Sequence, residues 1–270
     1  MKRKEYMDKY HLLLKTLKDK KKIAIAFSGG IDSTLLAYAA KQAEIVTLLI
    51  TITSPFFSKF DENMAVKIAS DLGFYHVLVP HDLDANVVKN PINRCYYCKN
   101  DEAKIWKKIA EQHGYSIVAD GCNVDDVQDE HRPGILACNK KGIWHPLAEV
   151  NITKMEIRNI ARAIGISIWN RPSNACLASR IQFGEEITIQ KLQMIEKAED
   201  FLRKISPQVR VRLHQNIARI EVPISYLKNV LTIRKEIVSF MHKIGFVYIT
   251  LDLRGYRSGS MHEDIMKKDV

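Results

Sequence analysis

The segment SGGIDST at residues 28–34 constrains the fold more than any other part of the chain. It follows an unbroken apolar run, IAIAF at residues 23–27, and precedes a stretch of helical composition, LLAYAAKQA at residues 35–43. A short apolar strand, a glycine turn and a helix in this order are typical of an α/β unit. We therefore expect the first strand of a sheet to end just before Ser28.

The same order of strand and helix recurs through the first half of the chain. Further apolar strands are expected at residues 44–51, 76–82 and 115–121, and helices at residues 61–73 and 100–114. Both helices end at a glycine, which is a common helix stop. Because the strands are apolar without alternation and are separated by helices, they predict an α/β fold with a parallel sheet covered on both faces.

A second, smaller domain of α+β class is expected in the last third of the chain. Residues 169–186 contain a proline and interrupt all periodicity, so we place the boundary near residue 185 and expect domains at 1–185 and 186–270. The expected elements of the second domain are a helix with one apolar face at 188–205, paired strands at 208–214 and 218–222, a helix of about 20 residues, and a last strand at 246–253. The first of these strands alternates apolar residues with Arg210, Arg212 and His214, which predicts a half-buried strand.

The composition is that of an ordinary folded protein with an excess of positive charge. Of 270 residues, 46% are hydrophobic and 27% are charged, which excludes a disordered or collagen-like chain. The formal net charge of +10 favours an anionic partner, either a polyanion or a phosphorylated small molecule. No apolar run approaches the length of about 18 residues that a membrane helix needs, so no membrane partner is expected. The number of cysteines is odd, and the N-terminal residues have the pattern of a basic amphipathic helix instead of a secretory signal. Both features predict a reducing, cytoplasmic location.

The SGGIDST segment has the residue types of a phosphate-binding loop. Its glycines let the backbone approach an anion, and a helix that starts near Asp32 directs free N–H groups and its positive dipole end toward that anion. The pattern is neither a Walker loop nor a GxGxxG motif, and it predicts a cradle for pyrophosphate. The residues expected to bind the phosphates are Ser28, Gly29, Gly30, Asp32, Ser33 and Thr34.

A second loop, DGCNVDD, follows the last predicted strand of the sheet. Ligands of α/β sheets bind at the carboxyl ends of strands, so we expect this loop beside the first, with Gly121 and Asn123 at the nucleotide. Asp32, together with Asp125 and Asp126, is expected to hold Mg²⁺ through carboxylate oxygens. A polar turn without a ligand is the alternative for this loop.

Cys95 and Cys98 form a CxxC motif, which leaves a redox pair, half of a zinc site, part of an iron–sulfur site and simple packing open. Cys176, in the Pro-containing segment, makes the iron–sulfur interpretation attractive. Three thiolates can hold a 4Fe-4S cluster through three of its irons and leave the fourth iron open to bind sulfide. A structural zinc site would more often have four protein ligands.

Cys176 also has an interpretation of its own as a nucleophile. Arg171 and Arg180 are close to it in sequence, and neighbouring positive charge raises the thiolate fraction of a cysteine. A shielded loop cysteine is the alternative. The remaining cysteines, Cys122 and Cys138, have small or apolar neighbours and are expected to be buried.

Arginines concentrate in loops and along one face of the second domain; they are Arg132, Arg180, Arg210, Arg212, Arg254 and Arg257. An arginine fork pairs with both oxygens of a carboxylate or phosphate, so an anionic nucleotide that bears carboxylates fits these residues. We expect Arg180, Arg212 and Arg257 to bind the substrate. Solvated surface arginine is the alternative for each of them.

The SGGxDS pattern after a first strand resembles the PP-loop ATP pyrophosphatases. With RCYYCK, DGCNVDD, HRPG, NRPSNACLASRI, VRVRLH and LDLRGYRSGS following in order, almost the whole chain resembles the LarE family of ATP-dependent pyridinium-3,5-biscarboxylate mononucleotide sulfur transferases. The resemblance implies a PP-loop domain with ATP and Mg²⁺, adenylation of a substrate carboxylate, and sulfur transfer through Cys176 in the synthesis of the nickel-pincer nucleotide cofactor.

One subgroup of this family gives up the sulfur of its own cysteine in a single turnover, and another holds a four-iron cluster on three cysteines that relays inorganic sulfide. Because Cys95 and Cys98 accompany Cys176, the chain resembles the cluster-bearing subgroup. The expected partners are the pyridinium-3,5-biscarboxylate mononucleotide, sulfide or another sulfur donor, and further copies of this chain. The alternatives are a tRNA-thiolating PP-loop enzyme, although nucleic acid is the less favoured partner, and a non-catalytic ATP-binding or iron–sulfur sensor protein.

Overall fold

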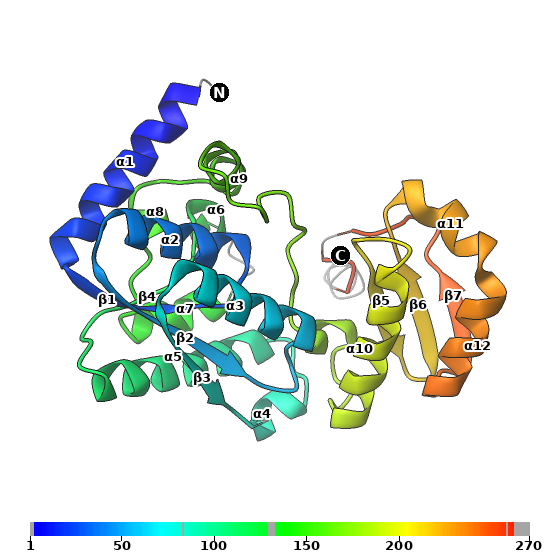
Figure 1. The fold of residues 1–270 in the computed structure, drawn as a ribbon. Helices are drawn as coiled ribbons and strands as arrows, with labels where there is room; N and C mark the ends of the chain where they lie inside the picture. The colour runs from blue at the N-terminus through cyan, green and yellow to red at the C-terminus, as the bar shows by residue number, and fades with distance from the viewer. Residues whose placement is uncertain (1–2, 83, 129–132, 258, 262–270) are drawn as a thin grey trace. The chain divides into compact units, whose positions relative to one another are not determined.

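The computed structural model describes residues 3–82, 84–128, 133–257 and 259–261 (Figure 1). The chain forms two compact units, one of Met1–Asp82 with Asn93–Asn174 and one of Leu83–Ile92 with Ala175–Val270. The first contains a parallel sheet with helices and the second contains a smaller sheet with helices, which confirms the predicted fold class. In the described ranges, every helix is too short or too polar to span a bilayer.

The first unit is an alternation of strands and helices. Its elements are α1 (Arg3–Lys20), β1 (Lys22–Ala26), α2 (Ile31–Gln42), β2 (Val46–Thr53), α3 (Lys59–Leu72), β3 (Tyr75–Pro80), α5 (Arg94–Gln112), β4 (Val118–Ala119), α6 (Val124–Gln128), α7 (Pro133–Lys140), α8 (Pro146–Glu149) and α9 (Lys154–Ala163). Its strands are parallel and lie in the order β3-β2-β1-β4.

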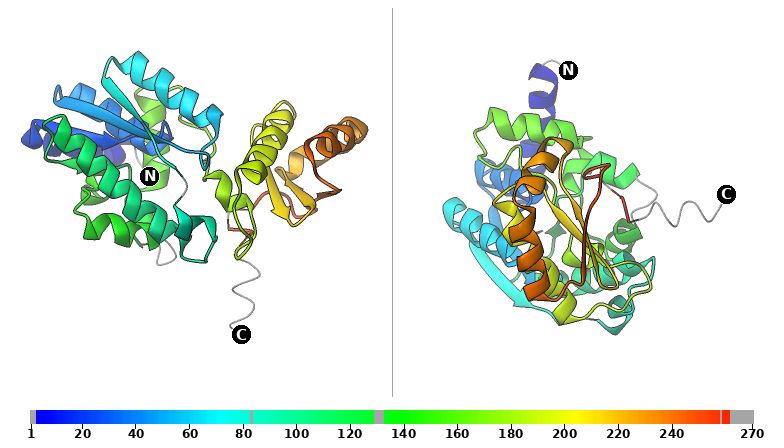
Figure 2. Two further views of the ribbon diagram at one scale, coloured as in Figure 1. Left: turned by 90° about the horizontal axis from the view of Figure 1, so that it is seen from below. Right: turned by 90° about the vertical axis from the view of Figure 1, so that its right-hand side faces the viewer.

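Both faces of this sheet are covered, as Figures 1 and 2 show. Ile23 and Ile25 of β1 join a core with apolar side chains of α1, α2, α3 and α9. Ala24 and Ala26, which point the other way, join a second core with α5 and with Cys138 of α7. A strand that is buried on both faces needs an unbroken apolar run, which explains the IAIAF sequence.

The ends of α3 and α9 are capped by residue types that are typical of helix caps. Ser58 caps α3 by accepting a hydrogen bond from the Asp61 N–H, and Gly73 ends the helix in a left-handed conformation. Thr153 and Glu156 form a complete capping box at the start of α9. These local bonds fix where α3 and α9 begin, and α9 brings Lys154 to Asp32 at the start of α2.

The second unit is a small α+β domain. Its elements are α4 (Ala85–Val88), the 3-10 helix η1 (Leu177–Arg180), α10 (Ile189–Arg203), β5 (Arg210–His214), β6 (Ile217–Glu221), the 3-10 helix η2 (Ile224–Tyr226), α11 (Leu227–Thr232), α12 (Arg234–Ile244) and β7 (Tyr248–Leu251). β5 pairs antiparallel with β6, and β6 pairs parallel with β7. Helices α10 and α12 lie side by side (Figure 2), and the rings of Phe201 and Phe240 stack 4.3 Å apart between them.

The contacts divide the chain earlier than the predicted boundary near residue 185, because residues 175–185 group with the second unit. The side chain of Asn90 explains part of this difference. Its Nδ2 donates to the carbonyl oxygens of Gln182, at 2.7 Å, and Glu185, at 3.0 Å. These hydrogen bonds connect a short segment around α4 to a loop about 90 residues later in the chain. The local sequence pattern does not predict this contact.

Candidate functional site

The loop between β1 and α2 has the backbone of an anion cradle. Gly29 has φ +66°, and a Cβ atom there would lie 2.8 Å from both the Cα and the N of Ala65 in α3. Only glycine accepts both that conformation and that approach. Gly30 is the N-cap of α2 and provides no side-chain cap, so the first N–H groups of α2 are open to an anion.

Hydroxyl groups surround this cradle. The Oγ atoms of Ser28 and Ser33 lie 3.2 Å apart, and the Gly30 N–H donates to Ser28 Oγ at 3.3 Å. Thr34 is buried, and its Oγ1 has no hydrogen-bond partner among the residues that the structure describes. A buried hydroxyl without a partner costs free energy, and a phosphate oxygen in the cradle would supply one.

The loop after β4 meets the cradle at the point where the strand order reverses. β4 pairs with β1 on the side opposite β2, so the loops after β1 and β4 flank the reversal, which is where α/β sheets bind ligands. A Cβ atom on Gly121 would lie 2.7 Å from the Ser33 N and 3.1 Å from the Asp32 Cβ. The structure thus brings together the two loops that the sequence predicts to be neighbours.

Asn123, predicted to bind the nucleotide, is fully buried and holds this loop in shape. Its Oδ1 accepts hydrogen bonds from the N–H groups of Asp125 and Asp126, and its Nδ2 donates to Asp126 Oδ2 at 2.6 Å. The polar groups of its side chain are therefore engaged within the loop. This geometry supports a positioning role for Asn123.

Asp32 stands at the start of α2 beside a positive charge that the sequence analysis missed. Lys154 Nζ donates to Asp32 Oδ1 at 2.6 Å, and the Lys154 N–H donates to Asp125 Oδ2 at 2.7 Å. Burial raises the pKa of Asp32, the ammonium of Lys154 opposes that shift, and the charge of Asp126 adds to it. A carboxylate in this position requires a cation, and its oxygens suit a hard ion.

Cys95 and Cys98 lie in the first two turns of α5, whereas the sequence predicts the helix from residue 100. Their spacing of three residues puts both thiols on the same side of the helix. Cys95 is exposed, and Cys98 Sγ donates to Glu102 Oε1 at 3.3 Å. Burial by itself would lower the pKa of Lys99, but its ion pair with Glu102 raises it, so an ammonium lies beside the motif.

Cys176 lies in the second unit at the N-cap of η1 and is a free thiol. Arg180 is completely buried beneath its loop: one guanidinium nitrogen donates to the carbonyl oxygens of Ala175, at 2.6 Å, and Cys176, at 2.9 Å. Two other nitrogens of Arg180 donate to Glu199 at 2.9 and 3.1 Å. The geometry therefore favours positioning of the Cys176 loop by Arg180, and its substrate-binding role stays a prediction.

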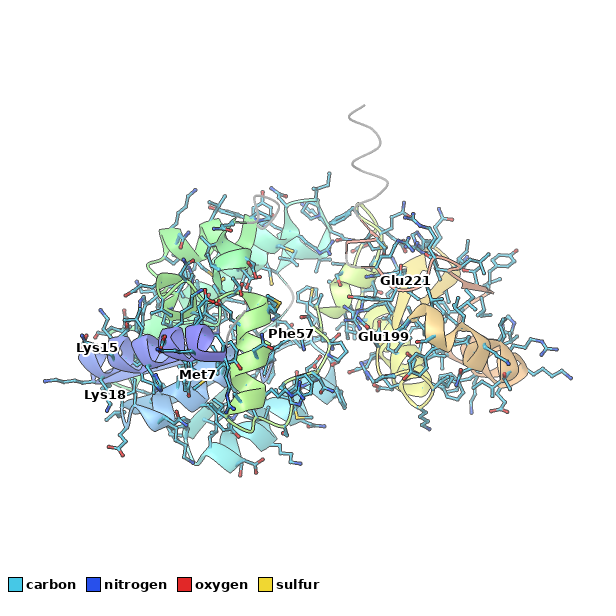
Figure 3. All side chains as sticks on the ribbon, turned by 90° about the horizontal axis from the view of Figure 1, so that it is seen from above. Met7, Lys15, Lys18, Phe57, Glu199 and Glu221 are labelled. Atoms are coloured by element: carbon cyan, nitrogen blue, oxygen red, sulfur yellow. The ribbon has the colours of Figure 1, made fainter. Side chains whose placement is uncertain are left out.

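The other predicted substrate arginines also face carboxylates. Arg212 Nε donates to Glu221 Oε2 at 3.0 Å, and Arg257 donates to Asp252 Oδ1 at 3.4 Å. Figure 3 shows Glu199 and Glu221, both without solvent exposure, in the interior of the second unit. Carboxylates of this kind hold arginine forks in fixed orientations, and Arg212 also donates to the Ser179 carbonyl oxygen at 3.2 Å.

The sequence also singles out Arg132, Arg171 and Arg210. Arg171, expected to activate Cys176, belongs to the first unit and pairs there with Asp61. Arg132 lies outside the described residues. Arg210 is buried beside Arg180 and Glu199, and burial together with the charge of Arg180 lowers its pKa to about 10.

The buried pair of Arg180 and Glu199 gives a stability prediction. Glu199→Ala is expected to lower the free energy of unfolding by about 3–5 kcal/mol, because it leaves a guanidinium buried without its counter-ion. Burial would raise the pKa of Glu199, but Arg180 outweighs it and the net pKa is lowered. The carboxylate therefore stabilises the fold fully above about pH 4.3 and loses this effect as the pH falls toward its folded-state pKa. Urea unfolding at pH 7 measures the change.

Asp200→Ala is the matched control, since the exposed Asp200 is the next residue of α10 and pairs only at the surface with Arg203. Its expected effect is within about 0.5 kcal/mol. Equal losses in the two variants would contradict the buried ion pair.

Comparison with known proteins finds relatives that span almost the whole chain, while no family model matches it. An uncharacterized protein of Synechocystis sp. is 40% identical over 249 residues, which are 90% of this chain and 92% of that protein. The pyridinium-3,5-bisthiocarboxylic acid mononucleotide synthase of Lactiplantibacillus plantarum is 31% identical over 264 residues, 96% of this chain and 95% of that protein. A probable tRNA sulfurtransferase of Methanothermobacter thermautotrophicus is 26% identical over 171 residues, 58% of this chain and 44% of that protein.

Proposed function

We propose that this chain, which belongs to the LarE family of pyridinium-3,5-bisthiocarboxylic acid mononucleotide synthases, uses ATP to convert a carboxylate of pyridinium-3,5-biscarboxylic acid mononucleotide to a thiocarboxylate. This reaction is a step in the synthesis of the nickel-pincer nucleotide cofactor. The observation that carries the proposal is the anion cradle between the β1 and β4 loops, in a chain similar to a named synthase along nearly its whole length.

In the first step, a carboxylate oxygen of the substrate attacks the α-phosphorus of ATP, the bond from that phosphorus to the bridging oxygen breaks, and pyrophosphate leaves. Negative charge on the phosphate oxygens is stabilised by the N–H groups at the start of α2 and by the Thr34 hydroxyl. The close approach of Gly29 to α3 and of Gly121 to α2 keeps this backbone in place. The product is an acyl adenylate.

Magnesium fits the residues beside the cradle. Asp32, Asp125 and Asp126 offer carboxylate oxygens, the ligands that Mg²⁺ prefers, and Asp32 already requires a cation, which Lys154 provides here. Bound Mg²⁺ would neutralise charge on the phosphates. Lys154 then becomes available to contact a phosphate oxygen.

In the second step, a sulfur nucleophile attacks the acyl carbon and AMP leaves with the carboxylate oxygen, so that a thiocarboxylate remains. Cys176 is proposed to deliver this sulfur as sulfide, as one of the cysteines that would hold an iron–sulfur cluster, and the bonds from Arg180 to the carbonyl oxygens of residues 175 and 176 hold its loop. Arg212 and Arg257 are proposed to bind the anionic groups of the substrate.

Cys95, Cys98 and Cys176 are reduced thiols outside any disulfide, and thiolates are the ligands of iron–sulfur clusters, so their chemistry fits a 4Fe-4S cluster. A cluster held by them would supply sulfide for repeated turnover. We expect Cys95→Ala, prepared without oxygen, to lose most of its iron and acid-labile sulfide, whereas Cys138→Ala keeps them. Full iron content and repeated turnover in Cys95→Ala would show that the cluster assignment is wrong.

The proposed function is tested by incubating the chain with ATP, Mg²⁺ and the pyridinium biscarboxylate mononucleotide. We expect pyrophosphate release that depends on the pyridinium compound and, with sulfide present, a thiocarboxylate detected by mass spectrometry. Pyrophosphate release that requires tRNA instead would support the thiolation alternative. No release with either substrate would favour a sensor protein. The cytoplasmic location and the homo-oligomeric state stay predictions.

A further inference from the structure

A group of three metal-ligating side chains lies in the first unit, apart from the cysteines considered above. Among the residues that the structure describes, Asp120, Cys122 and His145 each offer one ligand atom, and these atoms lie within 4.8 Å of one another. Neither the sequence analysis nor the proposed reaction gives this group a role.

The backbone holds the three residues in one place. Trp144 continues the sheet beside β4: its N–H donates to the Val118 carbonyl at 2.8 Å, and the Asp120 N–H donates to the Trp144 carbonyl at 3.0 Å. This pairing places His145 next to Asp120. The Cys122 N–H donates to Asp120 Oδ1 at 3.0 Å, which fixes the loop around the carboxylate. Ligands on a paired backbone are already ordered before an ion binds, which favours binding.

The imidazole of His145 lies between two oxygens. Its Nδ1 is 2.6 Å from Asp120 Oδ1, and its Nε2 is 2.8 Å from Asn139 Oδ1. A neutral imidazole carries one N–H and can donate to one of them. A metal ion bound by one ring nitrogen satisfies an arrangement in which both ring nitrogens face oxygens, because the other nitrogen then carries the N–H that donates.

The Cys122 thiol supplies the soft ligand atom of the group. Its Sγ lies within 4.8 Å of the ligand atoms of Asp120 and His145. A divalent ion bound there would displace the thiol proton, because a coordinating thiol is deprotonated. The cluster thus contains one strong acceptor, one imidazole and one latent thiolate around a common point.

We propose that Asp120, Cys122 and His145 bind a divalent ion of the Zn²⁺ class. One oxygen, one nitrogen and one sulfur ligand match Zn²⁺ or Co²⁺ and not Mg²⁺, which prefers oxygen alone. Zn²⁺ bond lengths put neighbouring ligand atoms of a tetrahedral site roughly 3.3–3.8 Å apart. Small side-chain rotations reach this from the present separations. The thiol proton leaves to solvent, and a fourth position stays open for water.

The ion would act on the nucleotide loops through Gly121, which lies between two of its ligands. A Cβ atom there would be 2.7 Å from the Ser33 N, so the loop has no room to shift toward α2. An ion bound by Asp120 and Cys122 would therefore hold Gly121, the residue of this loop that lies against the anion cradle, in place. The site does not depend on the proposed sulfur transfer, and its test leaves that function aside.

The test uses the full chain with Cys95, Cys98 and Cys176 all changed to serine, so that no iron–sulfur ligation competes. Untagged protein is titrated with Co²⁺, whose thiolate complexes show charge-transfer absorption that all-oxygen sites lack. We expect one Co²⁺ per chain with this absorption and its displacement by Zn²⁺. Absence of saturable uptake by the folded protein would overturn the proposal.

Further variants on the same background identify the ligands. Cys122→Ser is expected to lose the charge-transfer absorption, and His145→Gln to bind Co²⁺ about 100-fold more weakly while keeping the absorption at saturation. Cys138→Ser, at a buried cysteine outside the group, is the control and keeps both affinity and absorption. Circular dichroism checks that each variant folds. If Cys122→Ser does not fold, unchanged Co²⁺ affinity in His145→Gln would still contradict the site.

Discussion

Replacing Cys176 with serine is expected to lower thiocarboxylate formation by about 10³-fold or more, while pyrophosphate release stays within about threefold of that of the unmodified chain. A serine hydroxyl carries no sulfur and is a poor iron ligand, whereas the residues proposed for adenylation belong to the other unit. The substitution preserves the local fold, because the carbonyl of residue 176 still accepts from Arg180 at 2.9 Å and from Ser179 Oγ at 2.7 Å. Parallel assays of pyrophosphate and of product mass measure the two steps separately.

Cys138→Ser is the matched control, since Cys138 is buried and burial raises the pKa of its thiol to about 12, which makes it a poor nucleophile. It should retain both activities. Unchanged product formation by Cys176→Ser would remove Cys176 from the sulfur chemistry. The mass of the unmodified chain after turnover distinguishes the two modes of sulfur supply. A mass lowered by the loss of hydrogen sulfide after one turnover indicates that the chain consumes its own cysteine sulfur. An unchanged mass over many turnovers indicates that the chain relays sulfide.

The α/β part of the fold was predictable because its signals are local. The apolar run of β1, the glycines that follow it, and the capping box of Thr153 each act within a few residues. The neighbourhood of the β1 and β4 loops was predictable as well, since a general rule about strand ends in α/β sheets implies it. These signals identify the anion cradle without any knowledge of distant contacts.

Helix α5 begins earlier than its local sequence predicts. Residues 100–102, Asn-Asp-Glu, have the composition of a helix N-terminus, which predicts a start near residue 100. The helix begins at Arg94, and its N-cap Asn93 makes no side-chain capping bond. Arg94 and Glu102 are buried, so tertiary packing decides the boundary. The CxxC motif is therefore helical, which the sequence analysis did not predict.

Long-range ion pairs account for the other missed residues. Lys154 reaches Asp32 across 122 positions, and nothing near either residue indicates the contact. Glu199 did carry a signal, because it lies on the apolar stripe of α10 between Ile195 and Leu202. A charged residue on a buried helical face needs a partner.

The alternation in β5 predicts one apolar and one solvated face, yet Arg210 and Arg212 are both buried. The polar face is covered because Glu199 and Glu221 neutralise these arginines. A pattern of alternate residues distinguishes apolar from polar faces, but it does not distinguish a solvated polar face from one closed by ion pairs.

Gly29→Ala is expected to reduce pyrophosphate release by about 10²-fold or more and the free energy of unfolding by about 2 kcal/mol. The backbone at φ +66° is strained for alanine, and the new methyl group would lie 2.8 Å from backbone atoms of Ala65. Because the obstacle is backbone, either α3 or the loop must shift. A shift of the loop turns its N–H groups away from the α-phosphate, and a preorganised donor loses most of its effect when it is misplaced. Steady-state pyrophosphate release and urea unfolding measure the two effects.

Gly73→Ala separates strain from displacement of the cradle. Gly73 has φ +69°, nearly the same backbone conformation as Gly29, but no atom lies within 4 Å of the position of its Cβ. It ends α3 instead of forming the cradle, so the substitution should cost about 1 kcal/mol of stability and leave pyrophosphate release unchanged. Comparable activity in Gly29→Ala and Gly73→Ala would mean that the nucleotide does not bind against the β1 loop. Loss confined to Gly29→Ala, with both variants folded, would attribute adenylation to the close approach of that backbone to the phosphates.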